Sequence, residues 1–190
     1  MCRRGNRKKY RLNLETSNIA YWTIRVMHDN PILALVRNPY KLLHGAGLKK
    51  GQKVVEVGCG PGFFTIPAAR IVGDEGHIYA LDVHPRAVAR VKKKVEKIAL
   101  TNVTPLCINA SNTELPDRSI DLVFLFGLRS IAGGFEGMIF ELHRVLKPGG
   151  ILSFEKTRGS EGELIKEVER GGFAFTGKHG RIFLFKKKGE

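Results

Sequence analysis

The apolar residues of this chain follow two patterns that alternate along the sequence. Short continuous runs rich in Val, Ile, Leu and Phe are typical of strands buried on both faces of a sheet. Longer stretches have helical spacing, most clearly at 85–99, where one stripe is formed by Val88, Val91, Val95 and Ile98. We expect strands at residues 53–60, 77–83, 103–109, 120–127 and 151–156. We expect helices at residues 21–29, 32–47, 63–73, 85–99, 135–146 and 161–172.

Several of these helices have recognisable start and stop signals. Asn38 precedes Pro39, and His84 precedes Pro85, so each pair predicts a capping residue followed by a proline in the first helical turn. The segment Lys147-Pro148-Gly149-Gly150 predicts the end of the helix at 135–146, because proline and glycine interrupt regular structure.

Strands that alternate with helices predict a parallel sheet joined by right-handed crossovers. The last two apolar runs, 173–177 and 181–187, predict an antiparallel hairpin at one edge of that sheet. The predicted fold class is therefore α/β, a three-layer doubly wound sheet. We divide the chain into a basic helical N-terminal extension or lid, 1–45, and one domain, 46–190.

The stretch VVEVGCGPGFFT, residues 54–65, places an acid inside a buried strand and then glycine at every second position. In doubly wound sheets, ligands bind beyond the carboxyl ends of the strands. Gly58, Gly60 and Gly62 permit positive φ and a close approach of the backbone to a ligand. A tight turn without a ligand is the alternative, but three alternating glycines favour a binding loop.

Two cofactor classes compete for this loop. A nicotinamide dinucleotide site requires the spacing G-x-G-x-x-G, and here the third glycine comes one residue early. Glu56 also suits an ammonium group better than a pyrophosphate. Asp82 ends the next strand, where a carboxylate can accept hydrogen bonds from two ribose hydroxyls. A ligand with a ribose, an ammonium and no phosphate is S-adenosylmethionine, and we expect no metal.

The net charge of +14 is concentrated at the two ends of the 190-residue chain. Residues 1–53 hold 12 Lys/Arg against 2 Asp/Glu, residues 54–177 hold 15 of each, and residues 178–190 hold 5 against 1. This distribution suggests an anionic partner such as RNA, or serves solubility. No apolar run is long enough to span a membrane. Three cysteines without metal-like spacing favour a reducing, cytoplasmic setting.

Four motifs resemble the successive motifs of class I S-adenosylmethionine-dependent methyltransferases: VVEVGCGPGFFT, YALDVHPRAV, IDLVFLF and RVLKPGGIL. The similarity extends over roughly residues 40–185. Residues 38–73 further resemble a small prokaryotic group near the small-molecule methyltransferases. The resemblance implies a strand order of 3-2-1-4-5-7-6, with the last strand pair as an antiparallel hairpin.

The resemblance also assigns cofactor contacts. It places Gly58, Cys59 and Gly60 along the methionine and ribose, with Glu56 near the ammonium. It places Asp82 on the ribose hydroxyls and Val83 on the adenine face. Relatives often carry an acid that accepts from the adenine amine; Ser111 stands at that position here, and Ala110 supplies backbone groups beside it. Phe126 and Gly127 are expected to approach the methyl donor.

The acceptor side is less defined by the sequence, and no catalytic residue is assigned. A general base is needed only if the acceptor arrives protonated. Candidate acceptor contacts are Tyr21, Trp22, His28 and Arg129, each of which has an alternative as a packing or surface residue. We expect a methyltransferase for a small molecule. The alternatives are an RNA or ribosomal-protein methyltransferase that uses the basic ends, and a non-catalytic binding protein. A partner subunit that closes the site would make the chain a homo-oligomer.

Overall fold

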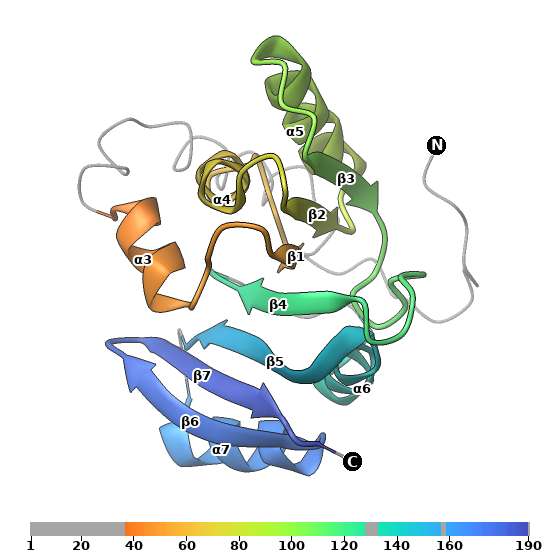
Figure 1. Cartoon of the computed structure of the whole chain (residues 1–190). Coiled ribbons are helices and arrows are strands. Elements are labelled where there is room, and N and C mark those ends of the chain that lie inside the picture. The colour runs from red at the N-terminus through yellow and green to blue at the C-terminus, as the bar shows by residue number, and fades with distance from the viewer. Residues whose placement is uncertain (1–36, 128–132, 157–158, 190) are drawn as a thin grey trace.

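The computed structural model describes residues 37–127, 133–156 and 159–189 (Figure 1). The helix expected at 21–29 lies outside the described residues. So do all four predicted acceptor contacts, Tyr21, Trp22, His28 and Arg129.

Seven strands form one sheet, and β4 is its central strand, with β1 beside it. The strands are β1 (Lys53–Val57), β2 (His77–Asp82), β3 (Val103–Cys107), β4 (Ile120–Leu125), β5 (Leu146–Glu155), β6 (Phe173–His179) and β7 (Ile182–Lys187). Their order is β3-β2-β1-β4-β5-β7-β6. The first five strands pair in parallel, whereas β7 runs antiparallel to both β5 and β6. The predicted fold class, strand order and terminal hairpin are thereby confirmed.

Helices cover both faces of this sheet and create two apolar cores (Figure 1). The helices are α3 (Pro39–Gly45), α4 (Thr65–Val72), α5 (Pro85–Lys97), α6 (Phe135–Val145) and α7 (Glu161–Arg170). One core joins α3, α4 and α5 to the sheet, and the other joins α6 and α7 to its opposite face. Leu43 of α3 is fully buried in the first core, so the described part of the predicted extension packs against the domain.

The capping signals read from the sequence act as expected. The Asn38 side chain accepts a hydrogen bond from the backbone N–H of Lys41 at the start of α3. The His84 imidazole accepts from the backbone N–H of Arg86 at the start of α5. Both helices therefore begin at the residue pairs that the prolines mark.

Strand β5 begins earlier than the sequence predicts. The Pro-Gly-Gly segment was expected to separate helix α6 from a strand at 151–156, but β5 already starts at Leu146. Ile120 pairs with Leu146, and the register then shifts so that Leu122 pairs with Ile151. The segment is thus an irregular stretch of strand, which local breaker signals alone do not distinguish from a loop.

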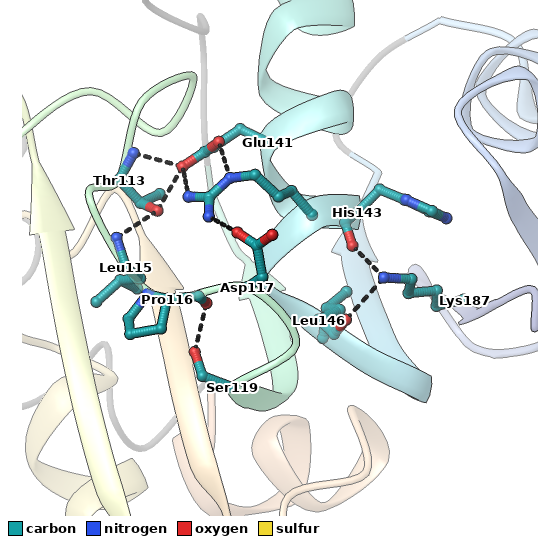
Figure 2. Close-up of polar contacts among 10 residues, drawn as sticks. Thr113, Leu115, Pro116, Asp117, Ser119, Glu141, His143, Leu146 and Lys187 are labelled. Carbon is teal, nitrogen blue, oxygen red and sulfur yellow. Dashed lines mark hydrogen bonds and ion pairs between the residues drawn. The ribbon is translucent and has the colours of Figure 1, made fainter. Parts of the chain in front are cut away.

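Lys187 does not contribute to the surface charge that the basic C-terminal segment suggests. Its side chain is only 5% exposed at the end of β7. Its ammonium donates to the carbonyl oxygens of His143 and Leu146, at 2.7 and 2.9 Å (Figure 2). These carbonyls lie at the C-terminus of α6, where a positive charge is favourable. One of the basic residues near the C-terminus is therefore structural and does not belong to a surface patch.

Gly171 provides a sharp test of the packing between α6 and α7. A Cβ at this position would lie 2.1 Å from Cγ2 of Ile139, a residue that is 2% exposed. We expect Gly171→Ala to lower the free energy of unfolding by about 1–3 kcal/mol, because the core must shift to accept one methyl group. The matched control is Gly162→Ala in the exposed first turn of α7, where a Cβ meets only Ser160 Oγ at 3.8 Å. Equal urea midpoints for the two variants would contradict this packing.

Candidate functional site

The glycine-rich loop after β1 is tied to the carboxyl end of β2. The backbone N–H groups of Gly58 and Cys59 both donate to the carbonyl of Leu81, at 2.8 and 2.9 Å. The predicted positive φ is present at all three glycines, with 73° at Gly58, 51° at Gly60 and 86° at Gly62. These values lie in the region that side chains other than glycine rarely adopt. The loop thus brings its backbone to the edge of the sheet where ligands of such folds bind.

Asp82 holds this loop in place. Its Oδ2 accepts from the backbone N–H of Gly60 at 2.9 Å, and its Oδ1 accepts from that of His84 at 2.8 Å. Burial raises the pKa of the Asp82 carboxyl, and the backbone hydrogen bonds oppose that rise. Each carboxylate oxygen can accept further hydrogen bonds beyond the one assigned here. The structure therefore brings Asp82 and Gly60 together, as the sequence predicts.

Glu56 lies beneath the loop and is 2% exposed. Burial raises the pKa of its carboxyl to about 8, the hydrogen bond from Thr65 lowers it, and the nearby charge of Asp82 raises it further. Thr65 donates from Oγ1 to Glu56 Oε2 at 2.6 Å. Sequence reasoning assigned no role to Thr65; the signal available was a hydroxyl at the end of the glycine motif, on the first turn of α4.

Cys59 is inert in this setting. Its side chain is 3% exposed, and burial raises the pKa of the thiol, with the Glu56 and Asp82 charges as smaller causes. A thiol with a raised pKa is a poor nucleophile. The side chain therefore fills space in the apolar core that includes α4 and α5.

Gly62 has a packing role in addition to its backbone conformation. A Cβ there would lie 3.2 Å from Cγ2 of Val91, so the glycine lets the loop approach α5. Lys94 of the same helix donates from Nζ to the carbonyl of Pro61 at 2.7 Å. Lys94 is half-buried and supports the outer side of the loop.

The adenine-side candidates lie at the ends of β2 and β3. Val83 is half-buried, and Ala110 is 7% exposed. The backbone N–H of Ser111 donates to Asn109 Oδ1 at 3.0 Å. A Cβ on Gly133, before α6, would lie 2.5 Å from Ser111 Oγ. The Ser111 hydroxyl therefore lies against the backbone that leads into α6, a long-range contact that the sequence does not reveal.

A second cluster forms at the carboxyl ends of β4 and β5. Phe126 packs against Phe64, with ring centroids 5.2 Å apart. Glu155 accepts from the backbone N–H of Gly127 at 2.9 Å and forms an ion pair with Arg37. The Arg37 guanidinium also lies 5.1 Å from the centre of the Phe64 ring. Arg37 and Glu155 were not predicted as site residues, because they are far apart in sequence and belong to no motif.

The polar groups at the carboxyl ends of β1 and β2 fit S-adenosylmethionine better than a dinucleotide. Glu56 and Asp82 are two carboxylates that disfavour each other's charge at the loop. An ammonium group would relieve that repulsion, whereas a pyrophosphate would add to it. Asp82 retains acceptor capacity for hydroxyl groups. The residues present are therefore chemically compatible with a cationic, ribose-containing ligand.

Comparisons with known proteins give a consistent result. A family model described as a methyltransferase domain matches residues 54–150. A demethylmenaquinone methyltransferase of Geobacillus stearothermophilus is 39% identical over 105 residues, which are 55% of this chain and 44% of that protein. A protein of the same name from Listeria welshimeri is 36% identical over 107 residues, 56% of this chain and 45% of that protein. The matched region thus spans less than half the length of these curated relatives.

The solved structures include a neighbour that matches along most of its length. A SAM-dependent methyltransferase from Aquifex aeolicus superposes with a TM-score of 0.76 and 28% identity, covering 87% of this chain and 97% of the other. S-adenosylmethionine (SAM) is the cofactor of such proteins. No helix in the part of the chain that the structure describes has both the length and the apolar character needed to cross a membrane. From the family match, the strand order and this neighbour, we conclude that the chain belongs to the methyltransferase-domain family and has the fold of class I SAM-dependent methyltransferases.

Proposed function

We propose that the chain transfers the methyl group of S-adenosylmethionine to a small-molecule acceptor. The observation that carries this proposal is the hydrogen bond between Gly60 N–H and Asp82, which joins the glycine loop to a half-buried acid beside the buried carboxyl of Glu56. In this proposal Gly58, Cys59 and Gly60 line the methionine and ribose, and Glu56 accepts the ammonium.

The other proposed contacts with the methyl donor come from residues at or just after the carboxyl ends of the strands. Asp82 binds the ribose hydroxyls with the acceptor capacity that Gly60 and His84 leave. Val83 packs on the adenine, Ala110 and Ser111 flank it, and Phe126 lies toward the methyl group.

When bound, S-adenosylmethionine supplies an electrophilic methyl group on a sulfonium sulfur. Transfer of that methyl group would break the carbon–sulfur bond, whose electron pair would stay on the sulfur, while Glu56 and Asp82 would hold the ammonium and the ribose. The chain's own residues orient the two reactants and exclude water from the sulfur. The rings of Phe64, Phe124 and Phe126 pack together at the end of β4, beside the ion pair of Arg37 and Glu155.

A small acceptor is favoured by two observations. The curated relatives are named for methylation of demethylmenaquinone, a small molecule, although they match this chain over less than half of their length. The apolar surroundings of Phe126 also suit an apolar acceptor better than a phosphate backbone.

RNA remains the alternative acceptor, with the basic chain ends as its binding surface. In the described C-terminal part, Lys187 is buried and Lys178 pairs with Glu161 at 2.7 Å. Less free positive charge is therefore presented there than the sequence suggests. A non-catalytic binding protein is the other alternative, and turnover separates it from an enzyme.

The acceptor class can be found by methyl transfer from radiolabelled S-adenosylmethionine into a cell extract. After the reaction, the extract is fractionated into RNA, protein, lipid and small molecules. We expect label in the lipid or small-molecule fraction. Label in RNA or protein would instead support the alternative acceptors, and cofactor binding without transfer would support the non-catalytic protein.

Proton release on ligand binding tests whether Glu56 accepts the ammonium of the ligand. With a pKa of about 8, Glu56 is mostly protonated at pH 7 in the free protein. An ammonium favours its carboxylate and lowers that pKa, so binding of S-adenosylhomocysteine should release up to one proton. Affinity should therefore rise from pH 6 to pH 8. Calorimetry at pH 7 in phosphate and in Tris measures the release, because the buffers differ in ionisation enthalpy. Unchanged proton release by Glu56→Gln would contradict the assignment.

A further inference from the structure

The loop between β3 and β4, residues 108–119, is attached to α6 by a polar cluster of four side chains. Figure 2 shows Thr113 and Asp117 of the loop near Glu141 of the helix. Arg144 of the same helix pairs with both Asp117 and Glu141. This loop also carries Ala110 and Ser111, the proposed neighbours of the adenine. None of these four side chains is among the site residues assigned above.

Glu141 is the centre of the attachment. Its Oε1 accepts from both the backbone N–H and the hydroxyl of Thr113, at 2.7 and 2.6 Å. Thr113 is 1% exposed, and its hydroxyl oxygen accepts in turn from the N–H of Leu115 at 3.3 Å. One carboxylate oxygen thereby fixes both the backbone and the side chain of the loop at a single residue.

Arg144 holds that carboxylate and the far end of the loop together. Its guanidinium donates to Glu141 Oε2 at 2.9 Å and to Oε1 at 2.7 Å, and it also pairs with Asp117. These charge-assisted hydrogen bonds lower the pKa of Glu141 to about 2, so the carboxylate stays charged at neutral pH. Backbone bonds from Arg118 and Ser119 to the end of α6 complete the attachment.

The start of α6 contacts the other part of the same loop. A Cβ at Gly133 would meet Ser111 Oγ at 2.5 Å and Asn109 Nδ2 at 2.8 Å, and a Cβ at Gly137 would lie 3.6 Å from Ser111 Cβ. Glu141 follows Gly137 by one helical turn, so both lie on the face of α6 toward the loop. Ser111 thus lies against the start of α6, and Thr113 and Asp117 of the same loop are held further along this helix.

We propose that Glu141 and Arg144 are positioning residues, which hold the β3–β4 loop where its backbone can contact the adenine of the bound methyl donor. Ser111 offers a neutral hydroxyl rather than a carboxylate, so recognition of the base depends on where the loop backbone is held. The inference rests on the proposed function, since it concerns the same cofactor site.

The test measures base selectivity rather than affinity alone. Calorimetry compares S-adenosylhomocysteine with S-inosylhomocysteine, in which an oxygen replaces the adenine amino group. We expect the wild-type protein to prefer the adenine compound. Glu141→Gln should weaken S-adenosylhomocysteine binding by about fivefold or more and reduce this preference, because the loop loses its charged anchor. Arg144→Lys should act in the same direction, with a smaller effect.

Two controls separate positioning from stability. Glu136→Gln changes an exposed acid on the first turn of the same helix and should leave both affinities unchanged. Thr113→Val removes the hydroxyl bond to Glu141 but keeps the branched shape, so it replaces Glu141→Gln if that variant fails to fold. An unchanged preference in folded Glu141→Gln or Thr113→Val would overturn the inference, as would equal weakening of both compounds. A wild-type protein that binds neither compound would instead contradict the proposed function.

Discussion

Gly60→Val is expected to lower the affinity for S-adenosylhomocysteine by more than about 100-fold. Gly60 has a φ of 51°, which a β-branched residue adopts only under strain. Its N–H also donates to Asp82, so a distorted backbone at this position disturbs the acid proposed to bind the ribose. The added side chain further fills space that the proposed ligand needs. Isothermal titration calorimetry measures the loss.

The matched control for this variant is Gly51→Val. Gly51 also has a positive φ, 81°, but a Cβ there meets nothing within 4 Å. The residue precedes the amino end of β1, whereas the glycine loop follows the carboxyl end. It should carry a similar backbone strain without touching the proposed site. Near-normal ligand affinity for Gly60→Val would contradict the proposed role of the loop, as would an equal loss for Gly51→Val.

Asp82→Ala is expected to weaken S-adenosylhomocysteine binding at least tenfold. A hydrogen bond to a charged group contributes about 1.5–3 kcal/mol, and about 1.4 kcal/mol corresponds to a factor of ten in affinity. The substitution removes the proposed bonds to the ribose and also the acceptors for Gly60 and His84. Calorimetry at fixed pH and salt gives the affinity, and urea denaturation gives the cost to the fold.

Asp82→Asn separates these two contributions. Its side-chain oxygen can still accept from Gly60, so the loop is retained better, but the negative charge is lost. We expect an affinity between those of the wild-type protein and Asp82→Ala. If both variants fold and bind with wild-type affinity, the ribose contact lies elsewhere.

The sequence predicts the fold well where local and global signals agree. Asn38 and His84 cap helices whose first turn contains the proline that follows each of them in the sequence. The apolar runs form the strands of the sheet. The glycine loop and Asp82 meet because the loop follows β1 and Asp82 ends the neighbouring parallel strand β2, which the alternation of elements already implies. The strand order itself came from the resemblance to a family, since periodicity does not specify it.

What the sequence misses depends on contacts between distant residues. Lys187 sits among three consecutive lysines, and only the position of α6 explains why this one is buried. Glu155 and Arg37 form their ion pair across 118 positions of sequence. Strand β5 begins at Leu146, before the Pro-Gly-Gly segment, because the neighbouring β4 offers a partner at Ile120. Tertiary pairing overrides local preference in each case.

The central claim is that the edge formed by the glycine loop, Glu56 and Asp82 binds S-adenosylmethionine. The most direct measurement is a calorimetric titration of the wild-type chain at pH 8 with S-adenosylhomocysteine and, separately, with reduced nicotinamide adenine dinucleotide. We expect saturable binding of S-adenosylhomocysteine at one site per chain and no binding of the dinucleotide. Binding of the dinucleotide in place of S-adenosylhomocysteine would contradict the central claim.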